Sequence, residues 1–181
     1  MSRLDSQSSL SDQSWPYHWA SMGWPVHPVD EDKHPLTRHG YKDATLDFDQ
    51  IAKCLKRWPN ALWAVVMGEI SRAVGIDIDR RTVKSGIVWG IDSLDEAGIT
   101  YFAAATPTAH TPSGGFHQLF RWPGRLVKSG PLWLAGKSVP GVDIKGDKSS
   151  LILPPGPGRS WDPILGPAMP LASLPWWAVM S

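Results

Sequence analysis

The sequence predicts an α+β fold with a mostly antiparallel sheet, flanking helices and a Pro- and Gly-rich C-terminal cover. Segments with the composition of strands outnumber those with helical periodicity, and several are joined by short links that suit turns. Proline and glycine, at 17 each among 181 residues, favour many turns and short elements. They exclude a coiled coil or a simple helical bundle, and the length fits one domain.

Residues that start or stop helices, together with apolar residues at helical spacing, predict three helices. In the last of them, Thr82 is a suitable cap, Val83 and Ile87 begin an apolar face, and Gly98 is a stop. The predicted helices cover 15–22, the segment from Asp47 to Pro59, and Thr82 to about Ala97.

Short, mostly apolar runs predict the strands, and the runs 62–67 and 73–79 are rich in β-branched residues. The runs 62–67 and 73–79 are separated by only five residues, so we expect them to form a hairpin. Residues 30–44 and 106–115 are polar or rich in Pro and Gly, which predicts loops. We expect the segment from Pro154 to be irregular, with Trp161, Trp176 and Trp177 as its anchors. The predicted strands are 24–29, 62–67, 73–79, 101–105, 116–122, 142–145 and 151–153.

Composition narrows the class of protein further. A formal charge of +1 gives no global attraction to nucleic acid, so any polyanion would need a local basic groove. The single Cys54 excludes an internal disulfide and fits a reducing cytoplasm. Residues 1–14 are rich in Ser and Gln and lack an apolar core, so we expect a flexible tail before one domain over 15–181. The longest apolar run, 61–67, is too short to span a membrane, which predicts a soluble protein.

The strongest candidate for chemistry is the pair Asp77 and Asp79 at the end of an apolar strand. Residues i and i+2 of a strand face the same side, so the two carboxylates should lie side by side, about 7 Å apart along the strand. Paired hard oxygen ligands suit Mg²⁺ or Mn²⁺. Two other Asp-x-Asp sequences, 30–32 and 47–49, lie in a polar loop and at a helix start, where solvated or capping carboxylates are expected.

Two further segments add candidate side chains. Ser113-Gly114-Gly115 predicts a tight turn whose amides can approach an anion, and His117 follows it on a strand as a structural histidine or a phosphate donor. In the segment 141–146, Asp143 and Lys145 alternate with apolar residues and share one face. Asp143 and Lys145 form either a surface ion pair or part of a metal cluster with the first two acids.

In this order, the motifs resemble the prim-pol domain of the archaeo-eukaryotic primase superfamily. That pattern has an acidic strand, a Ser-Gly-Gly-x-His turn, and an apolar-Asp strand followed by a basic residue and Pro-Pro. The resemblance covers about 15–161. This chain has Gly115 where some members have Ser, and Lys145 where Arg is frequent. The matching segments are Asp77-Ile-Asp79, Ser113-Gly-Gly-Phe-His117, Val142-Asp143-Ile-Lys145 and Pro154-Pro155.

The resemblance implies a catalytic core related to the RNA-recognition fold and nucleotidyl transfer from NTPs or dNTPs on a single-stranded DNA template. It assigns Asp77, Asp79 and Asp143 to two divalent cations, Mg²⁺ or Mn²⁺. Ser113, Gly114, Gly115 and His117 would bind the phosphates of the nucleotide, and Lys145 would offset developing charge. A helicase would be a separate or fused unit, because the sequence lacks a Gly-x-x-x-x-Gly-Lys-Ser/Thr motif.

Other functions explain less of the sequence. A non-catalytic module that binds single-stranded DNA or starts replication on the same fold remains the alternative, since the 11 Trp include candidates for base stacking. A rolling-circle nicking enzyme would need a His-x-His pair, which the sequence lacks. A metal-dependent glycosyltransferase would explain Asp77 and Asp79 but would leave His117 and Asp143 without a role.

Overall fold

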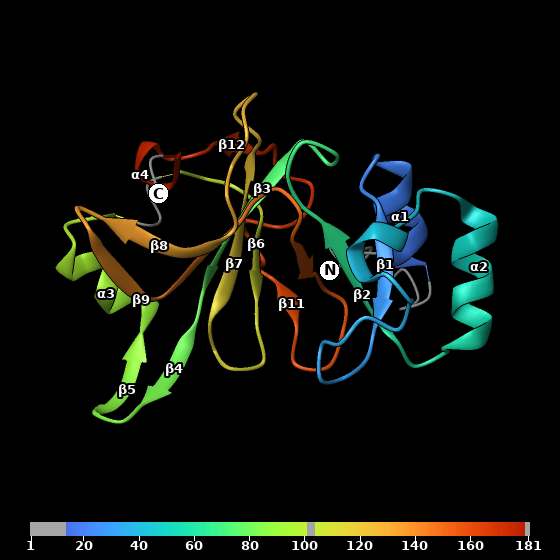
Figure 1. Cartoon of the computed structure of the whole chain (residues 1–181), viewed down its shortest axis with the longest axis horizontal. Coiled ribbons are helices and arrows are strands. Elements are labelled where there is room, and N and C mark those ends of the chain that lie inside the picture. The colour runs from blue at the N-terminus through green and yellow to red at the C-terminus, as the bar shows by residue number, and fades with distance from the viewer. Residues whose placement is uncertain (1–13, 101–103, 180–181) are drawn as a thin grey trace, which may run out of the picture.

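The structure, a computed structural model, describes residues 14–100 and 104–179 (Figure 1). Short strands make up most of its regular structure, and the helices lie at the edges. The helices are α1 (Trp15–Ser21), η1 (Gly40–Asp43, a 3₁₀ turn), α2 (Phe48–Arg57), α3 (Gly90–Glu96) and α4 (Trp176–Val179). The strands are β1 (Val26–Val29), β2 (Leu62–Val66), β3 (Ala73–Ile78), β4 (Arg80–Val83), β5 (Gly86–Trp89), β6 (Thr108–His110), β7 (Phe116–Arg121), β8 (Gly130–Leu134), β9 (Lys137–Lys145), β10 (Ser150–Ile152), β11 (Ser160–Trp161) and β12 (Ala172–Ser173).

The strands form two main sheets, and the α+β prediction is confirmed. The larger sheet has the order β11-β6-β7-β3-β9-β8, with β12 added in parallel to β7, and its other pairings are antiparallel. The smaller sheet has the order β1-β2-β10. Strands β4 and β5 form a separate two-stranded ribbon. In Figure 1 the ribbon points away from the sheets, and α2 lies at the opposite end of the molecule.

Two apolar clusters hold these layers together. One lies between the larger sheet and helices α3 and α4, and includes the fully buried Ile76 and Ile78. The other packs α1 and α2 against the smaller sheet. Gly75 on β3 allows the sheets to meet, because a Cβ there would collide with the Leu151 side chain on β10. The alternation of β3 therefore buries its isoleucines, as predicted, and leaves Asp77 and Asp79 on the other face.

The hairpin predicted from 62–67 and 73–79 is wrong. Strands β2 and β3 both exist, but they belong to different sheets and share only an isolated bridge between Gly68 and Ala73. Both edges of β2 are already paired, with β1 and β10, so β3 pairs with β7 and β9 instead. The left-handed backbone at Gly68 and Arg72 turns the chain from one sheet into the other.

The helix predicted from Thr82 is also wrong over its first half. Residues 80–89 form the β4–β5 ribbon, and α3 begins only at Gly90. Lys84 and Ser85 form the turn, Gly86 at the start of β5 has φ +133°, and the flanking Thr82, Val83, Ile87 and Val88 are β-branched residues that favour strands.

Other sequence predictions meet mixed outcomes. Residues 101–103 of the strand predicted at 101–105 and residues 1–13 of the predicted tail lie outside the described residues, and 104–105 are not in a strand. The predicted 106–115 loop contains the short strand β6. Trp177 is a buried anchor, as expected, and Trp161 packs edge-on against Trp19. Trp176 is 72% exposed, because in the short helix α4 it is Trp177 that is buried against the core.

Candidate functional site

A cleft of about 700 Å³ separates the exposed face of the larger sheet from the smaller sheet. Strands β3, β7 and β9 of the larger sheet form one wall, and β1, β2 and β10 form the other. All three predicted acids line it, together with Ser113, His117 and Lys145. Segments that are far apart in the sequence thus meet around one hollow, as the sequence analysis predicted for these side chains.

The strand register sets three of the polar side chains in one row. Asp77 on the central strand β3 lies directly opposite Asp143 on β9 and directly opposite His117 on β7. Residues opposite one another in antiparallel strands share a face of the sheet and have neighbouring side chains. His117 Nε2 lies 3.3 Å from Asp77 Oδ1. Asp79 follows two residues after Asp77 and so faces the same cleft.

Two basic side chains link the acids. Lys145 Nζ lies 3.1 Å from Asp143 Oδ2 and 3.5 Å from Asp77 Oδ2. Arg81, at the base of the ribbon, places Nη2 3.2 Å from Asp143 Oδ2 and Nε 3.4 Å from Asp79 Oδ2. Because Lys145 and Arg81 each contact two carboxylates, all three acids lie close enough to share neighbouring cations.

The local environment moves the pKa values of the first two acids in opposite directions. Burial would raise the pKa of Asp77, but the neighbouring His117 and Lys145 outweigh burial and lower it below its ordinary value. Burial and the adjacent charge of Asp77 raise the pKa of Asp79, although Arg81 and Lys33 oppose that shift. Asp77 is therefore held firmly as a carboxylate, whereas ionisation of Asp79 is disfavoured by the fold.

The turn Ser113-Gly114-Gly115 lies beside this acidic cluster. Gly115 is needed for close packing, and Gly114 for its backbone conformation. A Cβ at Gly115 would collide with the carbonyl oxygen of Ile78 and lie 3.1 Å from Asp79 Cα. Gly115 thus lets the turn pack directly on the end of β3. Gly114 has φ +85° and uses its amide within the turn, donating to the Thr111 carbonyl at 3.0 Å. The parts of this segment that line the cleft are the Ser113 side chain and His117.

Sequence reasoning missed Arg81, which contacts the acids, and two residues that line the cleft, and it set aside a third lining residue. Arg81 was missed because its segment was assigned to a helix, although Ser85-Gly86 between two β-branched runs could have indicated a hairpin. The others are His27 and Arg159, for which no spacing gave a signal, and Lys33, which composition placed among solvated loop charges.

Arg159 adds positive charge to the lining of the cleft. Arg159 is half-buried, its Nε is buried without a hydrogen-bond partner, and no carboxylate of the described residues lies within 4.0 Å of it. Burial lowers the pKa of its guanidinium. Its turn is fixed by Gly158, where a Cβ would approach Pro112 at 3.1 Å, next to Ser113. The cleft therefore has an acidic end and, beside the Ser113 turn, a cation free to bind an anion.

The donor set fits a divalent cation, although the described residues contain no group of three or more His, Cys, Asp or Glu already arranged around a metal position. Asp77 Oδ1 is buried, and its contact with His117 does not have hydrogen-bond geometry, so this oxygen has no hydrogen-bond partner. Lys145 and Arg81 supply the positive charge among the carboxylates in this arrangement. Hard oxygen ligands held this close together suit Mg²⁺ or Mn²⁺.

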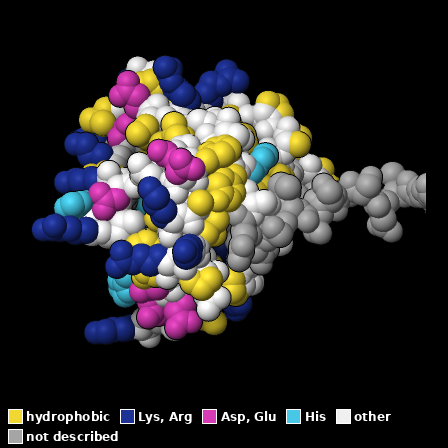
Figure 2. Space-filling view, turned by 90° about the vertical axis from the view of Figure 1, so that its right-hand side faces the viewer, with side chains coloured by type: hydrophobic (Ala, Val, Ile, Leu, Met, Phe, Trp, Pro, Cys, Tyr) yellow, Lys and Arg dark blue, Asp and Glu magenta, His cyan; other side chains and the backbone are white. Residues whose placement is uncertain are grey.

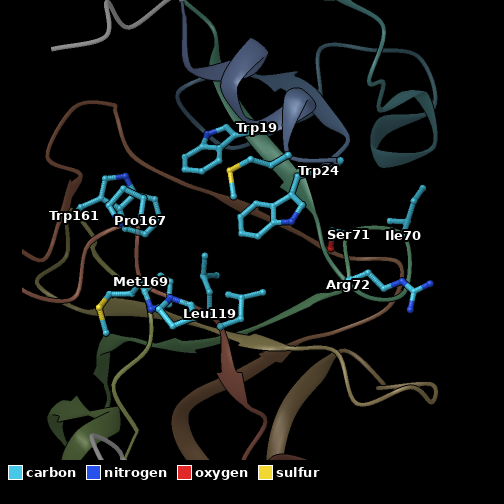
Figure 3. Close-up of a pocket in the computed structure, with 14 residues that line it drawn as sticks. Trp19, Trp24, Ile70, Ser71, Arg72, Leu119, Trp161, Pro167 and Met169 are labelled. Atoms are coloured by element: carbon cyan, nitrogen blue, oxygen red, sulfur yellow. The ribbon is translucent and has the colours of Figure 1, made fainter. Parts of the chain in front are cut away.

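A second hollow, of about 450 Å³, is apolar and contains none of the predicted site residues. Figure 3 shows Trp19 and Trp24 on one side and Leu119, Met169 and Pro167 across from them. The two indoles stack with ring centroids 5.6 Å apart. The predicted acids, Ser113, His117 and Lys145 therefore line the larger cleft and not this hollow.

The fold and the cleft define an α+β protein with clustered carboxylates on an antiparallel sheet, next to groups that can bind anions. A scan against models of protein families matches residues 17–177 to the family described as bifunctional DNA primase/polymerase, N-terminal. The chain belongs to this Prim-Pol family. The family indicates a nucleotidyltransferase-type activity that uses DNA and nucleotides. A search of curated proteins finds no match.

The described helices are also too short or too polar to cross a membrane.

Proposed function

We propose that the cleft catalyses template-directed nucleotidyl transfer from NTPs or dNTPs and that the protein makes or extends primers on single-stranded DNA. The row Asp143–Asp77–His117, with Asp79 beside it, supports this proposal most strongly. Three carboxylates lie next to the Ser113–Gly115 turn, which we propose binds phosphate, and Ser113 lines the same cleft. The sheet order β6-β7-β3-β9, with α3 between β3 and β6, also supports a core related to the RNA-recognition fold, in which the first and third strands are central.

Within the cleft, one group of residues would bind metal ions and another would bind the triphosphate. Asp77, Asp79 and Asp143 would hold Mg²⁺ or Mn²⁺, which when bound lowers the pKa of an attacking hydroxyl and stabilises a pyrophosphate leaving group. Ser113, His117 and Arg159 would orient the triphosphate. Lys145 would offset negative charge on the phosphate being transferred.

The alternative, a non-catalytic module that binds single-stranded DNA by stacking, has less support. Such binding needs exposed aromatic faces. Of the 11 Trp, all within the described residues, only Trp133 and Trp176 are exposed, at 53% and 72%. The remaining Trp side chains are buried or half-buried.

A primer-synthesis assay tests the proposal. Full-length protein is incubated with single-stranded DNA, labelled nucleotides and Mg²⁺ or Mn²⁺, and product is resolved on a gel. We expect product from the wild type and none from Asp77→Asn/Asp79→Asn. The matched control, Asp92→Asn/Asp95→Asn, removes two exposed carboxylates on α3, outside the cleft, and should retain activity. Equal product from the wild type and the Asp77 variant would refute the assignment, and metal-independent DNA binding without product would favour the alternative.

A further inference from the structure

The β4–β5 ribbon, residues 80–89, is an exposed arm at the edge of the candidate site. Its strands pair from Arg80–Trp89 to Val83–Gly86, and every residue from Arg80 to Ile87 is exposed. Figure 1 shows the ribbon extending away from both main sheets. A two-stranded ribbon is at best marginally stable by itself in water, so an arm of this kind is well placed to be covered by a ligand.

The charge of the arm is of one sign. It contains Arg80, Arg81 and Lys84 and no acidic residue, in a chain whose formal charge is only +1. Arg81 is occupied by Asp79 and Asp143. No carboxylate of the described residues lies within 4.0 Å of Arg80 or Lys84. Two cations therefore face solvent on a narrow projection, which is the charge pattern that attracts a polyanion.

The base of the arm is fixed to the cleft. β4 begins directly after Asp79, and the Gly90 amide after β5 donates to the Asp79 carbonyl at 2.9 Å. The Arg80 guanidinium lies 4.8 Å from the centre of the Trp89 ring. A Cβ at Gly114 would be 3.4 Å from Trp89 Cη2, so this indole lies against the Ser-Gly-Gly turn. A polymer that enters the cleft would thus pass close to the cations of the arm.

We propose that this arm binds the sugar–phosphate backbone of the nucleic acid that is used in the cleft, with Arg80 and Lys84 as phosphate contacts. The inference rests on the proposed function, because that function brings nucleic acid to the base of the arm. Contacts of this type hold the polymer in register and do not depend on base sequence. The exposed Ile87 lies opposite Thr82 and so on the same face as Arg80, where it would pack against sugars, which lack charge.

Salt-dependent binding of the full-length protein to a fluorescein-labelled single-stranded oligonucleotide, followed by anisotropy, tests the arm. The test variant is Arg80→Gln/Lys84→Gln. The matched control, Lys53→Gln/Lys56→Gln, removes two exposed cations from α2 at the opposite end of the molecule (Figure 1). Figure 2, which faces that end, shows Asp and Glu side chains among the Lys and Arg ones, so this surface is a mixed-charge comparison.

The expected size of the effect follows from counterion release. Each phosphate contact to a single strand contributes about 0.7 to the slope of log affinity against log salt, so losing two should reduce the slope by about 1.4. Between 50 and 200 mM salt the wild type should then lose about sevenfold more affinity than the arm variant does. Arg80→Lys/Lys84→Arg, which keeps both charges, should restore the slope, and the α2 control should match the wild type.

Three outcomes would overturn the arm proposal: an unchanged slope and Kd in Arg80→Gln/Lys84→Gln, an equal loss in the α2 control, or failure of the charge-preserving variant to restore binding. The proposed reaction is tested separately. If the wild type makes product that depends on Asp77 but the arm variant binds DNA as tightly, only the arm proposal fails. If binding depends on the arm but no variant makes product, only the proposed reaction fails.

Discussion

Replacing Gly115 by Ala tests how the Ser113–Gly115 turn is joined to the acidic strand β3. The added methyl group would collide with the Ile78 carbonyl oxygen and come within 3.1 Å of Asp79 Cα. Both obstacles are backbone atoms at the end of the central strand β3, so neither can move aside as the end of a flexible side chain would. The turn must shift away from β3 and take Ser113 with it.

The expected cost is that of inserting a methyl group into a packed region, about 1–3 kcal/mol. In a domain of this size each kcal/mol lowers the Tm by about 2–4 °C, so the melting temperature should fall by about 2–12 °C. Nucleotide incorporation at 25 °C, well below the transition, should fall further than unfolding alone explains, because the turn and the acids no longer hold their relative positions.

The measurements are thermal unfolding followed by circular dichroism and primer extension at saturating DNA. Gly166→Ala is the matched control, because an added Cβ there meets only the Asp162 carbonyl oxygen, at an ordinary 3.5 Å. A Tm for Gly115→Ala within about 1 °C of this control, with normal incorporation, would refute the packing argument.

Further predictions concern the charges of the cleft. The raised pKa of Asp79 means that its ionisation costs folding free energy at neutral pH, so Asp79→Asn should raise the free energy of unfolding in urea at pH 7. The pKa of Asp77 is lower in the folded protein than in the unfolded chain, so its ionised form stabilises the fold at pH values above the ordinary pKa of Asp. This stabilisation is lost as the pH falls through the folded-state pKa. Asp77→Asn should therefore lower the free energy of unfolding at pH 7 and make it depend less on acid pH. The same sign for both variants would contradict these shifts. Arg159→Gln should weaken nucleoside triphosphate binding about tenfold or more in calorimetric titration without lowering the Tm, as expected for loss of a charged hydrogen bond, whereas unchanged affinity would contradict the proposed role of Arg159 in phosphate binding.

The convergence of the site residues could be predicted because strand periodicity is local. Asp77 and Asp79 alternate with buried isoleucines, so their face followed from the sequence alone. Asp143 and Lys145 follow the same rule on β9. The family resemblance then supplied what periodicity cannot, namely that these strands and the one with His117 are neighbours in the sheet.

The arm and the strand pairing could not be predicted in this way. Val83, Ile87 and Ile91 have the spacing of a helical face, but the first two belong to opposite strands of a ribbon, and the β-branched composition decides between the alternatives. Pairing of β2 and β3 depends on β1 and β10, which occupy both edges of β2. Arg159 enters the cleft through an irregular segment, where no periodicity specifies the direction of a side chain.

A crystal structure with Mn²⁺ and a non-hydrolysable nucleoside triphosphate tests the central claim most directly. Anomalous scattering from manganese locates the ion independently of the surrounding atoms. The predicted result is manganese coordinated by Asp77 and Asp143, with Asp79 in reach, Lys145 or Arg81 displaced from its present carboxylate contacts, and the triphosphate beside Ser113 and His117. Manganese and triphosphate bound elsewhere, with Lys145 and Arg81 still paired to all three acids, would contradict the assignment of this cleft as the catalytic site.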